Sequence, residues 1–233
     1  SVIKELYLKG KYNYKDFAVL YRVNFQARAI EDALREELIA YRVMGGISFY
    51  QRKEIKDIIA YMRLVINSDD NVSLRRIINC PPRGIGAATL SKIEHEAKKK
   101  SLSLFNAIKA ILKVNGVAVS AREKLNGFIH LIEKIVSADY SSAADMVKEI
   151  IDKTKYADFI GEEKVQNIHE LIASAEGKDI NEFSDSAVLV TAMDSRNAEN
   201  SVSLMTLHST KGLEFPVVFV GGLEDGLLPY FKA

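Results

Sequence analysis

The sequence predicts an α/β protein in which both ends of the chain build one parallel sheet and a block of helices interrupts it. Three observations lead to this fold class. Strand and helix patterns alternate near the N-terminus, helical patterns fill the middle of the chain, and strand patterns return near the C-terminus. We therefore expect an α/β domain made of residues 1–68 and 199–233, with an all-helical domain inserted over residues 69–198.

Two strand-then-helix units make up the first segment. Phe17 to Tyr21 form a short, continuous apolar run, which is typical of a strand buried on both faces. The helix that follows, residues 25–38, has charges on one face and on the other the apolar side chains Ala29, Ile30, Ala33, Leu34 and Leu38. A second strand ends at the glycine pair 45–46, and a second amphipathic helix spans residues 51–66. Because strands and helices alternate, we expect the strands to be parallel.

The middle and the end of the chain have different patterns. Helices without a convincing strand are expected over residues 72–79, 87–100, 102–113, 119–137, 141–153 and 162–176. The polar stretch over residues 193–201 is expected to be the linker that returns the chain to the sheet. Val202 to Thr206 and Val217 to Val220 are short apolar runs rich in β-branched residues, and we expect two buried strands there.

Composition narrows the class of protein. The 233 residues include 32 Lys plus Arg against 31 Asp plus Glu, so the overall charge does not argue for a polyanionic partner. The single cysteine, Cys80, excludes an internal disulfide and a cysteine-based zinc site. No apolar stretch approaches the roughly 18 residues of a membrane span, and no secretory signal is present. We expect a cytoplasmic protein without a membrane partner, and the two ends of the sequence suggest a portion of a longer chain.

The sequence lacks the common motifs of autonomous catalysis. There is no G-x-x-x-x-G-K-[ST] phosphate loop, no H-E-x-x-H or G-x-S-x-G motif, and no Cys/His cluster that would bind a metal. The four histidines are scattered along the chain. We therefore expect no metal site, and no phosphate loop with which this chain alone would bind a nucleoside triphosphate.

A tight turn lies between two predicted helices in the stretch CPPRGIGAATL. Pro81 and Pro82 end the first helix, and we expect the amides of Gly84 to Gly86 to point outward, where they would suit an anion. Basic side chains surround this turn: Arg75, Arg76, Arg83, Lys92 and Lys98 to Lys100. The unit resembles the helix-hairpin-helix element, which grips the backbone of duplex DNA without reading its sequence. On spacing alone, an ordinary turn with solvated lysines is an equal alternative.

Two further stretches carry polar side chains at strand ends. Tyr21 and Arg22 lie at the carboxyl end of the first strand, the edge at which α/β sheets bind ligands. There a tyrosine would stack on a base and an arginine would reach a phosphate. On these residues alone, a plain strand-end tyrosine beside a surface arginine is the favoured alternative.

The loop after Thr206 is crowded with polar groups and glycine: His208, Ser209, Lys211, Gly212 and Glu214.

Four blocks of the sequence together carry a specific resemblance. The blocks are AVLYRVNFQARAIEDAL, YRVMGGISFYQRKEIKDIIAYMRL, NCPPRGIGAATL and VSLMTLHSTKGLEFPVVFVGGLEDGLLP. In this order, each resembles a block of the UvrD/PcrA/Rep helicases of superfamily 1, the first resembling motif IV and the last motif V. The resemblance is close over about the first 90 and the last 35 residues. It implies that the α/β domain is the RecA-like domain 2A and that the helical insertion is domain 2B.

The resemblance implies roles for individual residues. In the ATP site, Tyr21 would stack on adenine, Arg22 would reach the γ-phosphate as a catalytic arginine finger, Lys211 would lie near the terminal phosphate and Glu214 would bond the ribose. The translocating single strand would be held by Thr206 and His208, with Arg42 and Arg52 as helpers. Duplex DNA would be contacted by Arg83, Gly84, Ile85, Gly86 and Thr89.

The resemblance also implies the activity of a longer protein. The full-length enzyme would be an ATP-dependent DNA helicase that uses ATP and Mg, translocates on single-stranded DNA and unwinds duplex in the 3′ to 5′ direction. The phosphate-loop lysine and the Mg-binding motif would belong to N-terminal 1A and 1B domains of the same polypeptide. This fragment alone is expected to bind no cofactor and to be inactive. The alternatives are a free-standing DNA-binding or adaptor module without motor activity, and part of a RecB/AddA-like helicase-nuclease.

Overall fold

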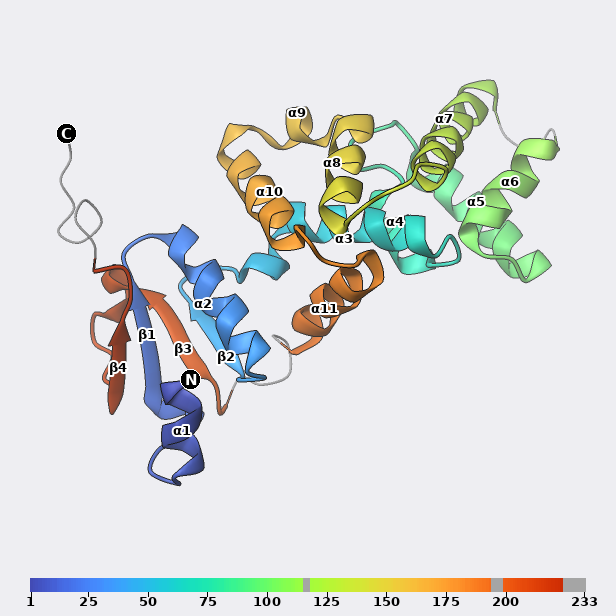
Figure 1. Cartoon of the computed structure of the whole chain (residues 1–233). Helices are drawn as coiled ribbons and strands as arrows, with labels where there is room; N and C mark the ends of the chain where they lie inside the picture. The colour runs from blue at the N-terminus through green and yellow to red at the C-terminus, as the bar shows by residue number, and fades with distance from the viewer. Residues whose placement is uncertain (115–117, 194–198, 224–233) are drawn as a thin grey trace. The chain divides into compact units, whose positions relative to one another are not determined.

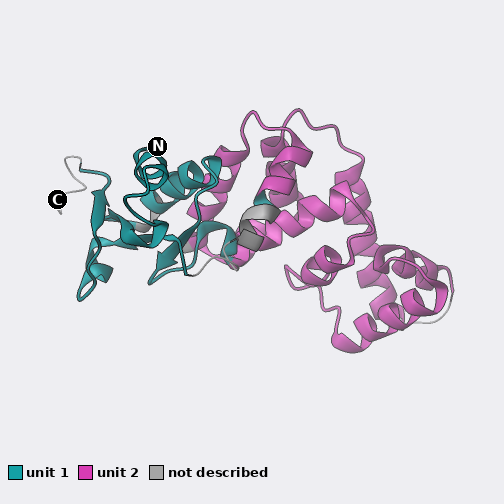
Figure 2. Cartoon of the chain, turned by 90° about the horizontal axis from the view of Figure 1, so that it is seen from below, with its two compact units in different colours: residues 1–52, 187–233 teal, residues 53–186 magenta. Residues whose placement is uncertain are grey.

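The computed structural model describes residues 1–114, 118–193 and 199–223 of the chain. The chain divides into two compact units, which Figure 2 distinguishes by colour. We call residues 1–52 and 187–233 the sheet unit, and residues 53–186 the helical unit. The division at residues 53 and 187 follows the packing of the helices. It does not test the domain boundaries expected at residues 69 and 198, which stay predictions.

A parallel four-stranded sheet forms the centre of the sheet unit and confirms the predicted α/β class. Its strands are β1 (Phe17–Tyr21), β2 (Tyr41–Met44), β3 (Val202–Thr206) and β4 (Val217–Val220). The order is β2-β3-β1-β4, so a strand from the end of the chain lies between two strands from its beginning (Figure 1). β1 and β3 pair with Tyr21 opposite Thr206. The carboxyl ends of these strands therefore meet at one edge of the sheet.

Helices and short turns surround this sheet. The sheet unit contains α1 (Val2–Leu8), α2 (Asn24–Glu36), part of α11 (Ile180–Met193), and the 3-10 turns η1 (Tyr14–Asp16), η2 (Phe49–Gln51) and η3 (Leu207–Thr210). Its core consists of Ile3, Phe17, Val19, Tyr21, Ala27, Leu34, Ile39, Tyr41, Val202 and Leu204. The strand residues among them belong to the continuous apolar runs, which a parallel sheet buries on both faces.

The buried face of α2 differs from the expected one. Ala29 and Ala33 are exposed, and Leu38 is 76% exposed. Leu38 lies just beyond the end of the helix and takes a left-handed conformation with φ 58°. The N–H of Ile39 then donates to the carbonyl of Leu34 (2.8 Å), and Ile39 enters the core. The expectation for Leu38 is wrong because the helix ends before it, so helical spacing no longer applies there.

β4 is only half buried, which corrects the expectation of two buried strands. β3 is central and buried, whereas β4 lies at the sheet edge beside β1. Phe219 packs against the core, while Val218 and Val220 are 48% and 40% exposed. A short apolar run is compatible with a central strand or an edge strand, so the sequence pattern does not separate the two.

The helical unit is built of α-helices. Its helices are α3 (Lys53–Ile66), α4 (Asn71–Ile77), α5 (Ala87–Lys100), α6 (Leu104–Lys113), α7 (Val119–Val136), α8 (Ala143–Thr154), α9 (Tyr156–Ile160), α10 (Glu162–Ala175) and the first part of α11. The six helices expected here match α4 to α8 and α10 within a few residues. The side chains of Asp70, Ser103 and Ser142 cap three of them by accepting backbone N–H bonds.

Two helices of this region, α9 and α11, were not predicted from the sequence. Most of the expected return linker, residues 193–201, lies outside the described residues. Among the helices that the structure describes, none is long and apolar enough to cross a membrane.

A buried carboxylate ties the helical unit together. Asp57 of α3 is 2% exposed and accepts hydrogen bonds from Arg76 Nε (2.7 Å), Tyr156 Oη (2.7 Å) and Cys80 Sγ (3.2 Å). These partners come from α4, α9 and the turn before α5, so one side chain joins three segments to α3. Burial, together with the hydrogen bond to Asp57, raises the pKa of the Cys80 thiol to about 11.

Replacing this carboxylate should destabilise the helical unit. Asp57→Ala leaves a buried hydroxyl and an arginine without their acceptor, and we expect the free energy of unfolding to fall by about 3–5 kcal/mol. Urea denaturation followed by circular dichroism measures the change. Asp152→Ala on α8 removes an exposed carboxylate and should leave the unfolding midpoint almost unchanged. Equal midpoints for Asp57→Ala and the wild-type chain would contradict the proposed role of Asp57.

Candidate functional site

Three strand ends meet at the carboxyl edge of the sheet. β1 ends at Tyr21, β3 ends at Thr206 opposite it, and β2 ends before a turn of two glycines. The turn residue Gly45 has φ 75°, and a Cβ atom there would lie 3.2 Å from Ser209 Oγ of η3. The turn after β2 therefore packs closely against the loop after β3. This edge gathers residues from both ends of the chain.

The structure brings two of the predicted site residues into direct contact. Arg22 Nη1 lies 3.1 Å from His208 Nδ1, although 186 positions separate them in the sequence. An arginine is only a donor, so this hydrogen bond requires His208 to carry its proton on Nε2 and to accept at Nδ1. The residue expected to contact ATP and a residue expected to contact DNA therefore share one hydrogen bond.

The backbone around Arg22 is held by a residue that the sequence analysis missed. Gln26 Oε1 accepts hydrogen bonds from the backbone N–H groups of Arg22 (3.0 Å) and Val23 (3.1 Å), which caps the start of α2. A Cβ atom at Gly222 would meet Gln26 Nε2, so a larger residue there would have to displace this amide. The one sequence signal was a glutamine at the third position of the helix, a frequent capping position.

Tyr21 is buried rather than presented at the surface. Its side chain is 1% exposed, and burial together with the nearby Glu31 carboxylate raises its pKa to about 12, against an opposing effect of Arg52. The phenol is therefore neutral at physiological pH. Stacking on adenine stays a prediction, and the structure adds the condition that the ring must first be uncovered.

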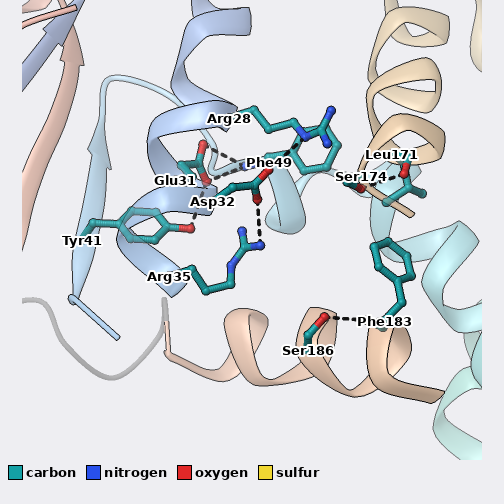
Figure 3. A network of polar contacts seen from close by, with 10 residues as sticks. All are labelled: Arg28, Glu31, Asp32, Arg35, Tyr41, Phe49, Leu171, Ser174, Phe183 and Ser186. Atoms are coloured by element: carbon teal, nitrogen blue, oxygen red, sulfur yellow. Dashed lines mark hydrogen bonds and ion pairs between the residues drawn. The ribbon is translucent and has the colours of Figure 1, made fainter. Parts of the chain in front are cut away.

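Glu31 is a second residue that the sequence analysis missed. It is 1% exposed and accepts hydrogen bonds from Tyr41 Oη (3.1 Å) and the backbone N–H of Phe49 (3.2 Å), as Figure 3 shows. This carboxylate therefore fixes β2 and η2 to α2. Amphipathic periodicity places charged residues outward, so a charge buried by tertiary contacts leaves no trace in that pattern. On the same helix, Asp32 pairs with Arg28 and Arg35, as a surface charge does.

The two expected helper arginines lie on the elements that Glu31 fixes. Arg42 is exposed on β2, and its Nε donates to the buried Ser203 Oγ (3.2 Å). It borders a hollow of about 280 Å³ together with Tyr41, Val43, Gly46, Ile47, Ser48 and Gln51. The guanidinium of Arg52 lies 5.4 Å from the centre of the Phe49 ring. Their contacts with a single strand stay predictions.

The loop after β3 presents the remaining expected residues. Thr206 Oγ1 lies 2.9 Å from Ser209 Oγ, and His208 is exposed. Lys211 and Glu214 are exposed between η3 and β4. Thr206 and His208 thus lie at the same sheet edge as Arg22, where a ligand can reach them. The roles implied for Lys211 and Glu214 stay predictions.

Arg83 of the G-I-G turn holds the protein fold itself. Its Nη1 donates to the carbonyl oxygens of Ile77 (2.9 Å), Ile78 (3.3 Å) and Pro81 (3.3 Å). The guanidinium also lies 5.9 Å and 5.4 Å from the ring centres of Tyr61 and Phe128. The side chain has a structural role that the sequence did not reveal. Its contact with duplex DNA stays a prediction, although these bonds leave its guanidinium largely engaged.

The amides of the G-I-G turn do not all point outward as expected. Asn79 Oδ1 accepts from the N–H groups of Arg83 (2.7 Å) and Ile85 (3.2 Å), and Ile85 is 5% exposed. Of the three amides expected to point outward, that of Ile85 is therefore satisfied internally, by the Asn79 side chain. Gly84 and Gly86 are exposed, and Thr89 lies half-buried in the first turn of α5.

The described residues offer no metal centre. Across residues 1–114, 118–193 and 199–223, no group of three or more His, Cys, Asp or Glu side chains is placed to hold a metal ion.

Comparisons with known proteins place the chain in a family. The profile of the UvrD-like helicase C-terminal domain matches residues 1–233. The ATP-dependent DNA helicase PcrA of Bacillus subtilis is 39% identical over 99% of this chain and 34% of its own length. The probable DNA helicase II homolog of Rickettsia conorii is 37% identical over 97% of this chain and 36% of its own length. PcrA of Staphylococcus epidermidis is 33% identical over 100% of this chain and 34% of its own length.

These matches confirm the resemblance drawn from the sequence motifs. The chain spans about a third of the length of the relatives it matches. The match with the Bacillus protein covers 253 residues, more than the 233 of this chain, so that relative carries segments that this chain lacks. The family profile covers both the sheet unit and the helical unit. This chain belongs to the UvrD-like helicase C-terminal domain family.

Proposed function

We propose that this chain supplies the second half of the ATP site and part of the single-strand track of an ATP-dependent DNA helicase. The observation that carries the proposal is the contact between Arg22 and His208 at the carboxyl edge of the sheet. By resemblance to the family, the first residue serves ATP and the second serves DNA. The names of the relatives, which are DNA helicases, favour this function over an adaptor without motor activity.

The charged side chains of the sheet edge fit the polar end of a nucleotide. Arg22 and Lys211 bring positive charge, and Glu214 brings a carboxylate that suits the ribose hydroxyls. Bound ATP supplies the phosphoryl group whose transfer drives a helicase. Arg22 stabilises the negative charge that develops during that transfer, because it is a fixed cation supplied from the second domain. The ligands of Mg, and the phosphate loop, would come from an N-terminal half of the same polypeptide.

The hydrogen bond between Arg22 and His208 gives this function a coupling mechanism. When Arg22 turns to the phosphates, His208 Nδ1 loses its donor, so the ring can move its proton to Nδ1 and donate from there to a backbone phosphate of the DNA strand. When the DNA backbone draws the proton to Nδ1, His208 no longer accepts from Arg22 and the guanidinium is released. Each ligand thereby removes a contact that competes with the other ligand, which produces positive coupling between the two sites.

The duplex contact and the direction of movement complete the proposal. The exposed glycines of the G-I-G turn would face the backbone of duplex DNA, and Thr206 with His208 would hold the single strand. By resemblance to its family, the full polypeptide translocates 3′ to 5′ and unwinds the duplex at the junction. A bacterial DNA helicase would carry out this work in the cytoplasm, where the DNA is.

Replacing the arginine should separate hydrolysis from DNA binding. In the native polypeptide that carries this chain, we expect Arg22→Ala to lower DNA-stimulated ATP hydrolysis by about 10³ to 10⁵, the usual worth of an arginine finger. Affinity for single-stranded DNA should stay within a few-fold. Steady-state ATPase assays and fluorescence anisotropy measure both quantities. Lys153→Ala is the matched control, because it removes a cation from α8, away from the site, and should leave hydrolysis unchanged. Hydrolysis at the wild-type rate would sink the assignment of Arg22.

The tautomer of His208 tests the coupling mechanism directly. In the 15N-labelled chain without ligands, we expect imidazole spectra to place the His208 proton on Nε2, because Arg22 donates to Nδ1. Arg22→Ala should change this pattern toward a mixture of tautomers, whereas His130, exposed on α7, should be unaffected. An unchanged His208 spectrum in Arg22→Ala would mean that the hydrogen bond does not control this ring.

A further inference from the structure

Lys124 of α7 places its ammonium group directly on the G-I-G turn. Its Nζ donates to the carbonyl oxygen of Gly84 (3.1 Å). A Cβ atom on Gly84 would lie 2.9 Å from the same nitrogen, so lysine and glycine are in close contact. Nothing in the pattern of the turn itself points to this residue, because 40 positions separate it from Gly84.

The positive charge expected from Arg83 is directed into the protein. That guanidinium donates to three backbone carbonyls and lies over two aromatic rings. An arginine held in this way stabilises the turn and offers little of its charge to an outside ligand. Lys124 is exposed, and an ammonium group has three donors, of which Gly84 accepts one.

The surface beside Lys124 is open. Gly86 is the N-cap of the 14-residue helix α5 and is exposed, and apart from its chain neighbours no atom lies within 4 Å of where a Cβ atom would be. A phosphate group can therefore approach the start of α5 closely, and the helix dipole favours an anion there. The ammonium group of Lys124, which points at the same turn, adds a full positive charge to that approach.

We propose that Lys124, and not Arg83, is the cation through which the G-I-G turn contacts a backbone phosphate of duplex DNA. The inference rests on the proposed function of the turn and adds a residue to it. One lysine bound to one phosphate releases condensed counterions from DNA but reads no base. The contact therefore strengthens duplex binding equally for all sequences.

Duplex binding by the native polypeptide tests the proposal. We expect Lys124→Ala to weaken the affinity for a blunt duplex and to lower the slope of log affinity against log salt by about 1. The loss should be equal for duplexes of different sequence, and Lys124→Arg should restore most of the affinity. Lys134→Ala removes an exposed lysine from the same helix and should leave both quantities unchanged. Circular dichroism checks that each variant is folded.

A glycine variant distinguishes failure of this inference from failure of the turn's role. Gly86 has an ordinary backbone conformation (φ −78°) and open space around it, so Gly86→Gln should fold normally and still obstruct a phosphate. If Gly86→Gln weakens duplex binding but Lys124→Ala leaves affinity and salt slope unchanged, the assignment of Lys124 is overturned while the role of the turn survives. If neither variant weakens duplex binding, the turn does not contact DNA and both proposals fail. If Lys124→Ala leaves duplex affinity and its salt slope unchanged but weakens the binding of polyglutamate, Lys124 serves an acidic protein partner instead of DNA.

Discussion

The parallel pairing of β3 with β1 is the constraint on which the candidate site depends. It sets Tyr21 opposite Thr206, so residues from the two ends of the chain reach one edge of the sheet. Only because of this register do Arg22 and His208 come within 3.1 Å of each other. The helical unit is inserted between these strands in the sequence, and the sheet is complete only when the chain returns from it.

In the helical unit, the G-I-G turn depends on polar groups buried beneath it. Asp57 holds the Cys80 thiol, and Tyr61 Oη donates to the Cys80 carbonyl (2.6 Å). Arg83 then donates to the carbonyls of Ile77 and Pro81, in the segment that leads into the turn. Such a network fixes the backbone of the turn from within, which leaves the exposed glycines and Lys124 to face a ligand. Arg83, the arginine nearest to the glycines, thus supports the fold, and in our proposal the charge that meets DNA comes from Lys124 on α7.

Features that depend on local pattern could be predicted, and features that depend on tertiary contacts could not. Short apolar runs and helical spacing located the strands and eight helices, two in the first segment and six in the insertion, because both signals are contained within a few neighbouring residues. The position of β4 at the sheet edge, the burial of Glu31 and the inward direction of Arg83 arise from contacts between distant segments. The site residues came from motif resemblance, and the residues that support them, Gln26 and Lys124, came only from the structure.

One measurement tests most directly the claim that a single sheet edge serves both ATP and DNA. The affinity of the native polypeptide for single-stranded DNA would be determined with and without a saturating non-hydrolysable ATP analogue. If each ligand breaks the contact between Arg22 and His208, each should favour the other, and we expect DNA to bind at least about fivefold more tightly with the analogue present. Equal or weaker binding in its presence would contradict the account.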